Sequence, residues 1–177
     1  GALSGLFPVD DVLVRWLHER ARALGDAHPR VNAARVRQLE RDAAALNADA
    51  GAPYTKVLSL QLDSVVPHVS GPNHVKHMTS VAELQARHVR VHKAYIVSCV
   101  NSRSSDLSAA AAVVRQHGAG ARVADGVELY VSAASSEVQR AAEQSGDWQV
   151  LVDAGAHVLP PGCGPCIGLG AGLLRDG

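Results

Sequence analysis

Three cysteines are the residues of this sequence whose type and spacing could do chemistry. Cys163 and Cys166 are separated by two residues, and Cys99 lies far upstream of them. Two thiolates in this spacing and one distant thiolate can supply three ligands to a metal centre. A cubane iron–sulfur cluster normally takes four cysteines, so three would leave one iron open as a Lewis acid. The pattern therefore predicts a cluster that takes part in a reaction.

Other interpretations of the cysteines stay open at this point. They could be turn and core cysteines without a metal, or part of a zinc site completed by His157 or His92. The run Cys163-Gly164-Pro165-Cys166 also spells the active-site motif of a thioredoxin-type redox dithiol. We expect no such dithiol, because that fold places its motif early and needs further strands after it.

Composition excludes several classes of protein. The 177 residues carry 17 basic and 17 acidic side chains, so no positive excess is present to bind nucleic acid. No run of about 18 apolar residues occurs, and we therefore expect no membrane-spanning segment. Three cysteines are too few for a disulfide-stapled secreted domain. A reducing compartment and a small-molecule partner are the remaining expectations.

The elements that must position the cysteines follow from periodicity and capping residues. Helices are predicted over 9–24 and after an Asn32 cap, and alternating leucines predict a half-buried strand over 56–63. Ser80 and Glu83 predict a capping box for a further short helix. A turn-rich stretch at 67–73 suggests two domains, 1–66 and 67–177. Strands are expected at 94–97, 127–131 and 157–159, and the helices between them are capped by Ser105 or Asp106 and by Ser136.

Alternating strands and helices predict an α/β protein with a parallel sheet. Cys99 follows the first of these strands, and Cys163 and Cys166 follow the last. Ligands of open parallel sheets gather at the carboxyl ends of the strands. We therefore expect all three thiols at one edge of the sheet.

Two segments resemble the cluster-binding motifs of the aconitase superfamily: Val97–Arg103 with Asp106-Leu107, and Gly162–Gly168. Within the superfamily, the chain is most similar to the fungal-type homoaconitases. Supporting stretches occur along the whole chain, namely Gly5–Asp10, Val69–Asn73, Lys93–Tyr95, Ala124–Val127, Gly146–Gln149 and Gly168–Gly170.

The resemblance implies an aconitase-type three-layer α/β/α fold with a mainly parallel sheet, present here in part. It implies a [4Fe–4S] cluster held by Cys99, Cys163 and Cys166, and a hydro-lyase located in the mitochondrial matrix. The enzyme would act on a small tricarboxylic acid, and it would interconvert homoisocitrate and cis-homoaconitate by reversible loss of water. This reaction lies on the α-aminoadipate route to lysine.

Departures from the family pattern add further expectations. Val100 stands where the family usually has Thr, and we expect this to tune the cluster environment. The chain resembles a central segment of a larger enzyme, so its partners would be the missing upstream domains and the swivelling C-terminal domain. We expect it to be inactive alone, and no residue is assigned as catalytic.

Arg103 is a candidate ligand for a substrate carboxylate, although a solvated arginine at a helix start is the more common case. The alternative enzymes are the large subunit of 3-isopropylmalate dehydratase and aconitase. The alternative from another class is a non-catalytic cluster-binding or regulatory remnant.

Overall fold

The computed structural model describes residues 4–174, and its contacts divide the chain into two compact units. The first unit is Gly1–Val65 and the second is Val66–Gly177. No helix in the described part of the chain is long and apolar enough to cross a membrane.

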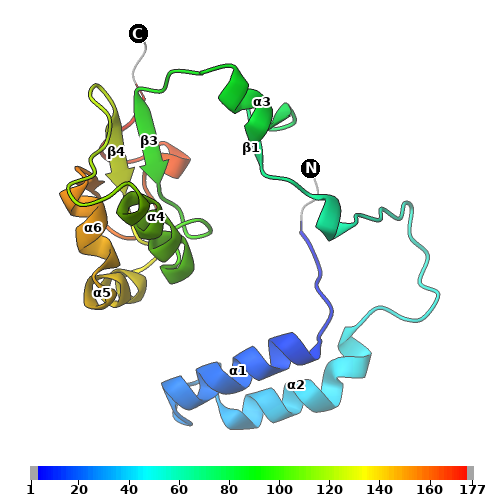
Figure 1. Ribbon diagram of the computed structural model, residues 1–177. Coiled ribbons are helices and arrows are strands. Elements are labelled where there is room, and N and C mark those ends of the chain that lie inside the picture. The colour runs from blue at the N-terminus through cyan, green and yellow to red at the C-terminus, as the bar shows by residue number, and fades with distance from the viewer. Residues whose placement is uncertain (1–3, 175–177) are drawn as a thin grey trace. The chain divides into compact units, whose positions relative to one another are not determined.

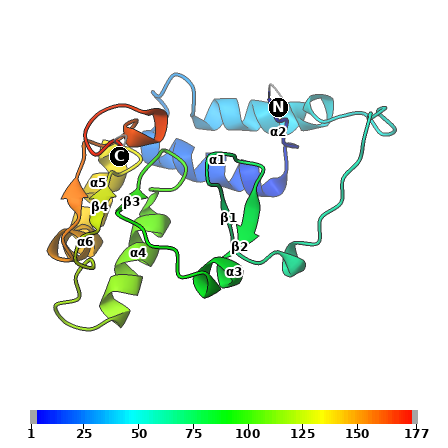
Figure 2. The same ribbon diagram turned by 90° about the horizontal axis from the view of Figure 1, so that it is seen from above.

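The first unit contains a pair of helices. Helix α1 spans Asp11–Leu24 and helix α2 spans Ala33–Leu46, and the two lie side by side in antiparallel directions (Figures 1 and 2). The Asp10 carboxylate accepts a hydrogen bond from the Leu13 amide at 2.8 Å, which caps α1. The Asn32 side chain accepts from the Arg35 amide at 3.0 Å and caps α2, as predicted.

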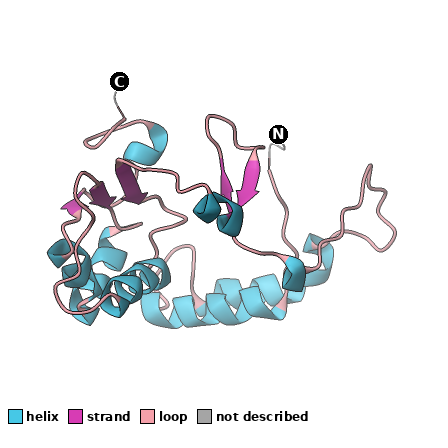
Figure 3. Cartoon of the chain, turned by 45° about the horizontal axis from the view of Figure 1, so that its top comes forward, coloured by secondary structure: helices cyan, strands magenta, loops and turns pink. Residues whose placement is uncertain are grey.

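The prediction of a strand over 56–63 is wrong. Figure 3 shows this stretch as loop that ends in a single turn of 3-10 helix, η1 (Leu62–Ser64). Leu58, Leu60 and Leu62 are all exposed. Alternation creates an apolar face but supplies no neighbouring strand, and an isolated extended segment has no partner for its backbone groups. No described segment pairs with it.

The second unit begins with a small hairpin. Strands β1 (His68–Ser70) and β2 (Met78–Ser80) pair antiparallel and lead into helix α3, Val81–Ala86. The Ser80 hydroxyl accepts a hydrogen bond from the Glu83 amide at 3.2 Å, which confirms the predicted cap of this helix.

A parallel sheet with helices forms the rest of the second unit. Its strands are β3 (Lys93–Ile96), β4 (Glu128–Val131) and β5 (His157–Val158), in the spatial order β3-β4-β5. The connecting helices are α4 (Ser104–Gln116), α5 (Ser136–Ser145) and α6 (Asp147–Asp153). The parallel α/β class is thereby confirmed, and of the three layers the described residues comprise the sheet and one helix layer (Figure 1).

The core lies between the sheet and this helix layer. Side chains alternate along a strand, so Ile96, Leu129 and Val131 face the helices, which are packed against one another. The buried side chains of the core are those of Leu107, Ala111, Val131, Ala133, Ala142, Trp148, Leu151 and Ala156. The other face of the sheet carries the polar and aromatic alternates, among them Tyr95 and Tyr130.

Two predicted helix caps require correction. Helix α4 begins at Ser104 with Arg103 as its N-cap, and Asp106 lies inside the first turn. The Asp106 carboxylate accepts a hydrogen bond from the Arg103 amide at 3.0 Å, so it stabilises the helix start without being the cap residue. Helix α5 is capped by Ser135, whose hydroxyl accepts from the Val138 amide at 3.2 Å, and not by the next serine.

Candidate metal centre

The three cysteines lie on two loops that leave the same edge of the parallel sheet. Cys99 follows the end of β3, whereas Cys163 and Cys166 follow the end of β5. Both strands pair parallel with β4, so their carboxyl ends share one edge. All three thiols are free and exposed. This placement makes them accessible to a metal centre that binds from outside the sheet.

The backbone before Cys99 is held in an unusual conformation. Ser98 has φ +96°, a region that side-chain-bearing residues occupy at a cost of about 1–3 kcal/mol. Its hydroxyl accepts hydrogen bonds from the amides of Val100 at 3.3 Å and Asn101 at 3.0 Å. These two bonds close a tight turn around Cys99 and compensate part of the conformational cost.

The loop that carries Cys163 and Cys166 closes on itself. The Gly164 carbonyl accepts hydrogen bonds from the amides of Ile167 and Leu169, both at 3.1 Å. Within this closed loop, Pro165–Ile167 forms one turn of 3-10 helix, η2, which includes Cys166. Gly168 ends this turn with φ +75°, which a residue without a Cβ adopts at no steric cost.

The donor set fits an iron–sulfur cluster in its chemistry. Thiolates are the ligands that hold such clusters, and each cysteine binds a different iron, so the thiols surround the cluster without converging on one point. Among the described residues, no group of three or more His, Cys, Asp or Glu side chains is arranged so that it could hold a metal ion. The zinc alternative with His157 or His92 therefore has no support in this part of the chain.

A buried hydroxyl beside the Cys99 loop has no hydrogen-bond partner within residues 4–174. Ser102 is fully buried, and its Oγ is the buried side-chain polar atom for which the described residues provide no hydrogen bond. An unsatisfied buried hydroxyl costs about 1–3 kcal/mol. Such a group is often explained by a bound acceptor, and the sulfur atoms of a cluster are acceptors of this kind.

Arg103 lies at the start of α4, close in sequence to the first cysteine. Its side chain is exposed, and within residues 4–174 it forms no hydrogen bond or ion pair. Its carbonyl accepts from the amides of Asp106 and Leu107, both at 3.0 Å, which fixes the backbone but leaves the guanidinium available. Val100 is also exposed.

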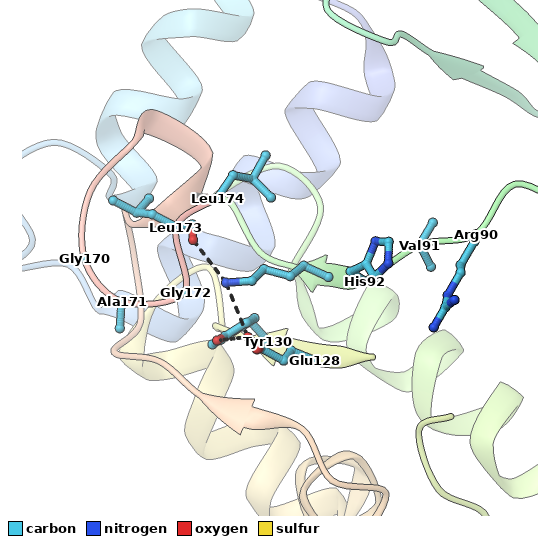
Figure 4. Close-up of a pocket in the computed structure, with 11 residues that line it drawn as sticks. Arg90, Val91, His92, Glu128, Tyr130, Gly170, Ala171, Gly172, Leu173 and Leu174 are labelled. Atoms are coloured by element: carbon cyan, nitrogen blue, oxygen red, sulfur yellow. Dashed lines mark hydrogen bonds and ion pairs between the residues drawn. The ribbon is translucent and has the colours of Figure 1, made fainter. Parts of the chain in front are cut away.

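A cavity of about 970 Å³ lies elsewhere, beside the amino ends of β3 and β4. Figure 4 shows Glu128 and Tyr130 on the sheet and Gly170–Leu174 across the cavity from them. Glu128 Oε2 accepts a hydrogen bond from the Tyr130 hydroxyl at 2.5 Å and lies 3.3 Å from Lys93 Nζ. The hydrogen bond from Tyr130, followed by that from Lys93, lowers the pKa of Glu128. None of the cysteines lines this cavity.

Sequence reasoning assigned no positioning role to three serines near the cysteine loops: Ser98, Ser102 and Ser132. A serine directly after a strand and before free amides is typical of a local hydroxyl-closed turn, so Ser98 had a usable signal. The environments of Ser102 and Ser132 arise from segments distant in sequence and left no such signal.

Two comparisons with known proteins return matches to this chain. A family profile described as the aconitase family (aconitate hydratase) matches residues 1–177. The chain is similar to proteins named "Homoaconitase, mitochondrial" from Mycosarcoma maydis (52% identical over 190 residues), Debaryomyces hansenii and Yarrowia lipolytica (each 52% over 177 residues). These alignments cover 100% of this chain and 25% of each relative.

The family profile matches all residues of the chain, and this match defines the class of the protein. Enzymes of this class generally use a [4Fe–4S] cluster as their cofactor. The chain belongs to the aconitase family. It spans about a quarter of the length of the curated relatives that it matches.

Proposed function

We propose that this chain is the cluster-holding part of a hydro-lyase that interconverts homoisocitrate and cis-homoaconitate in lysine biosynthesis. The observation that carries the proposal is the position of three free thiols on two loops at one edge of a parallel sheet. Relatives about half identical to the chain are named homoaconitases, which favours this substrate over those of other aconitase-family enzymes. Their names also favour a mitochondrial location.

Cys99, Cys163 and Cys166 would hold the cluster, one thiolate for each of three irons. When bound, the cluster supplies a Lewis acid at its open iron for removal of a hydroxide from carbon. The turn at Ser98 fixes the backbone on both sides of Cys99. The exposed Arg103 guanidinium would bind a carboxylate of the tricarboxylic-acid substrate through two parallel hydrogen bonds.

The activity is proposed for a longer chain. The alignments leave three quarters of each relative unmatched, and no residue described here is assigned as the base that removes a proton from the substrate. The 177 residues alone are expected to bind the cluster without turning over substrate.

Anaerobic reconstitution followed by iron and sulfide analysis tests the ligand assignment. The unaltered chain should take up roughly four irons and four sulfides. Cys99→Ser, Cys163→Ser and Cys166→Ser should each lose most of this content, whereas Ser105→Ala on the exposed start of α4 should retain it. Full uptake by any one cysteine variant would contradict its assignment as a ligand.

The substrate is tested in the longest natural form of the chain. Values of kcat/KM for homoisocitrate should exceed those for isocitrate and 3-isopropylmalate. Arg103→Lys should raise the KM for homoisocitrate, because an ammonium cannot form the paired hydrogen bonds of a guanidinium. Arg87→Lys, at the residue that follows the end of α3, serves as the control. A preference for isocitrate or 3-isopropylmalate would overturn the substrate assignment and leave the cluster assignment standing.

A further inference from the structure

The short segment 132–134, which follows β4, lies between the two cysteine-bearing loops and carries no thiol itself. The Ala134 amide donates a hydrogen bond to the Ser102 carbonyl at 2.9 Å, on the loop after Cys99. The Gly162 amide, directly before Cys163, donates to the Ala133 carbonyl at 2.9 Å. This segment therefore touches both loops through the backbone.

Ser132 ties the same two parts of the chain together with both its backbone and its side chain. Its amide donates to the Ile96 carbonyl at the end of β3 at 3.0 Å. Its hydroxyl donates to the Pro160 carbonyl at 2.7 Å, three residues before Cys163. Ser132 is 1% exposed, so its own amide and hydroxyl are shielded from water.

Sheet geometry explains why a connection through β4 is needed. Neighbouring strands lie about 4.8 Å apart, so β3 and β5, on opposite sides of β4, lie about 10 Å apart. Among the described residues, no hydrogen bond joins the loop after β3 directly to the loop after β5. Each loop is anchored to segment 132–134 instead.

We propose that Ser132 is a positioning residue that sets the separation between Cys99 and the pair Cys163 and Cys166. Its significance for the reaction rests on the proposed function, since a cluster requires three thiols at the correct mutual distances. Loss of the Ser132 hydroxyl removes the donor to the Pro160 carbonyl and frees the start of the second cysteine loop.

The distance between Cys99 and Cys163 can be measured in the full chain without any cluster. Nitroxide labels on Cys99 and Cys163, in a Cys166→Ser background, report their distance distribution by pulsed electron paramagnetic resonance. Ser132→Ala should broaden this distribution, and Ser132→Thr, which retains the hydroxyl, should restore its width. Ser135→Ala is the matched control, because it removes a hydroxyl from the same loop that caps α5 and contacts neither cysteine loop. An unchanged distribution in Ser132→Ala would overturn the proposal.

A second measurement uses the chain with its cluster. In Ser132→Ala, a chelator should remove iron about five times faster than in the unaltered chain, the effect of one net hydrogen bond. Equal rates, with a cluster present in both chains, would count against Ser132 and not against the proposed function. No cluster in the folded, unaltered chain would defeat the proposed function, while the label distances would still decide the role of Ser132.

Hydrogen exchange keeps the proposal testable if Ser132→Ala does not fold. In the unaltered chain, the amides of Ala134 and Gly162 should exchange as slowly as the amide of Leu159, which bonds to the Val131 carbonyl in the sheet. Exchange at the rate of exposed loop amides would show that segment 132–134 does not hold the loops and would overturn the proposal.

Discussion

The hydroxyl of Tyr95 donates a hydrogen bond to the carbonyl of Gly172, which lies 77 residues later in the sequence. The Tyr95 ring is stacked with that of Tyr130 on the neighbouring strand, with centroids 5.5 Å apart. A Cβ on Gly172 would lie 2.7 Å from Tyr130 Cε1, so only glycine fits against these rings. The chain after the second cysteine loop is thereby fastened to the face of the sheet opposite the helices.

Gly172→Ala should release this segment from the sheet. Gly172 has φ +80°, where alanine costs about 1–2 kcal/mol, and contact with Tyr130 adds to that cost. Gly170→Ala is a matched control because its φ is +81° and nothing lies within 4 Å of its Cβ position. Urea unfolding should show a larger loss of stability for Gly172→Ala. Equal losses would mean that the contact with Tyr130 is unimportant.

Substitution of Ser98 separates backbone strain from hydrogen bonding in the Cys99 turn. Ser98→Ala and Ser98→Gly both remove the hydroxyl, but only glycine adopts φ +96° without strain. The glycine variant should therefore be more stable by about 1 kcal/mol in chemical denaturation. Both should speed amide exchange at Val100 and Asn101, whose acceptor is lost. Greater stability of the alanine variant would contradict this interpretation.

Truncation of Leu107 should strongly destabilise the second unit. Its side chain on α4 is 0% exposed within the core, and Leu→Ala at such positions costs about 2–5 kcal/mol. Val113→Ala on the same helix removes a side chain that is 54% exposed and should change stability by less than about 0.5 kcal/mol. Equilibrium unfolding followed by circular dichroism compares the two, and similar losses would refute the assigned core.

Acid should weaken the attachment of α6 to α4. The Asp147 carboxylate accepts hydrogen bonds from Ser108 at 2.5 Å, Arg115 at 2.7 Å and Ser145 at 3.0 Å. The bond from Ser108, then that from Arg115, lowers the pKa of Asp147. The unfolded-state pKa of an aspartate is about 3.9. Because the pKa of Asp147 is lower in the folded state, its carboxylate stabilises the fold fully at pH values above the unfolded-state pKa. This contribution is lost as the pH falls through the folded-state pKa.

Urea unfolding between pH 7 and pH 3 measures this contribution. The difference in free energy of unfolding between the unaltered chain and Asp147→Asn should be constant near neutral pH and shrink below about pH 4. Asp153→Asn removes an exposed carboxylate from the same helix and should change stability by less than about 0.5 kcal/mol. A difference that grows as the pH falls would have the wrong sign and refute the interpretation.

Sequence patterns predicted most of the second unit correctly because its elements carry local signals. Ser80 caps α3 as predicted, and the three parallel strands lie within one residue of the predicted starts and ends. The cap of α5 was missed by a single residue, because Ser135 and Ser136 have the same chemistry and only backbone geometry distinguishes them. The metal-ligand roles of the cysteines stay a prediction.

The sequence by itself determined what depends on local order: helix caps at Asn32 and Ser80, the short apolar runs of the parallel strands, and the spacing of the cysteines. The tertiary structure decided which of these local patterns pair with a second segment of the chain. The leucines of 56–63 alternate but no described strand pairs with them, whereas Ser132 and Gly172 carry no local signal yet join distant segments. The physical reason is that strand pairing and buried hydrogen bonds need a second segment, and only the fold brings that segment within reach.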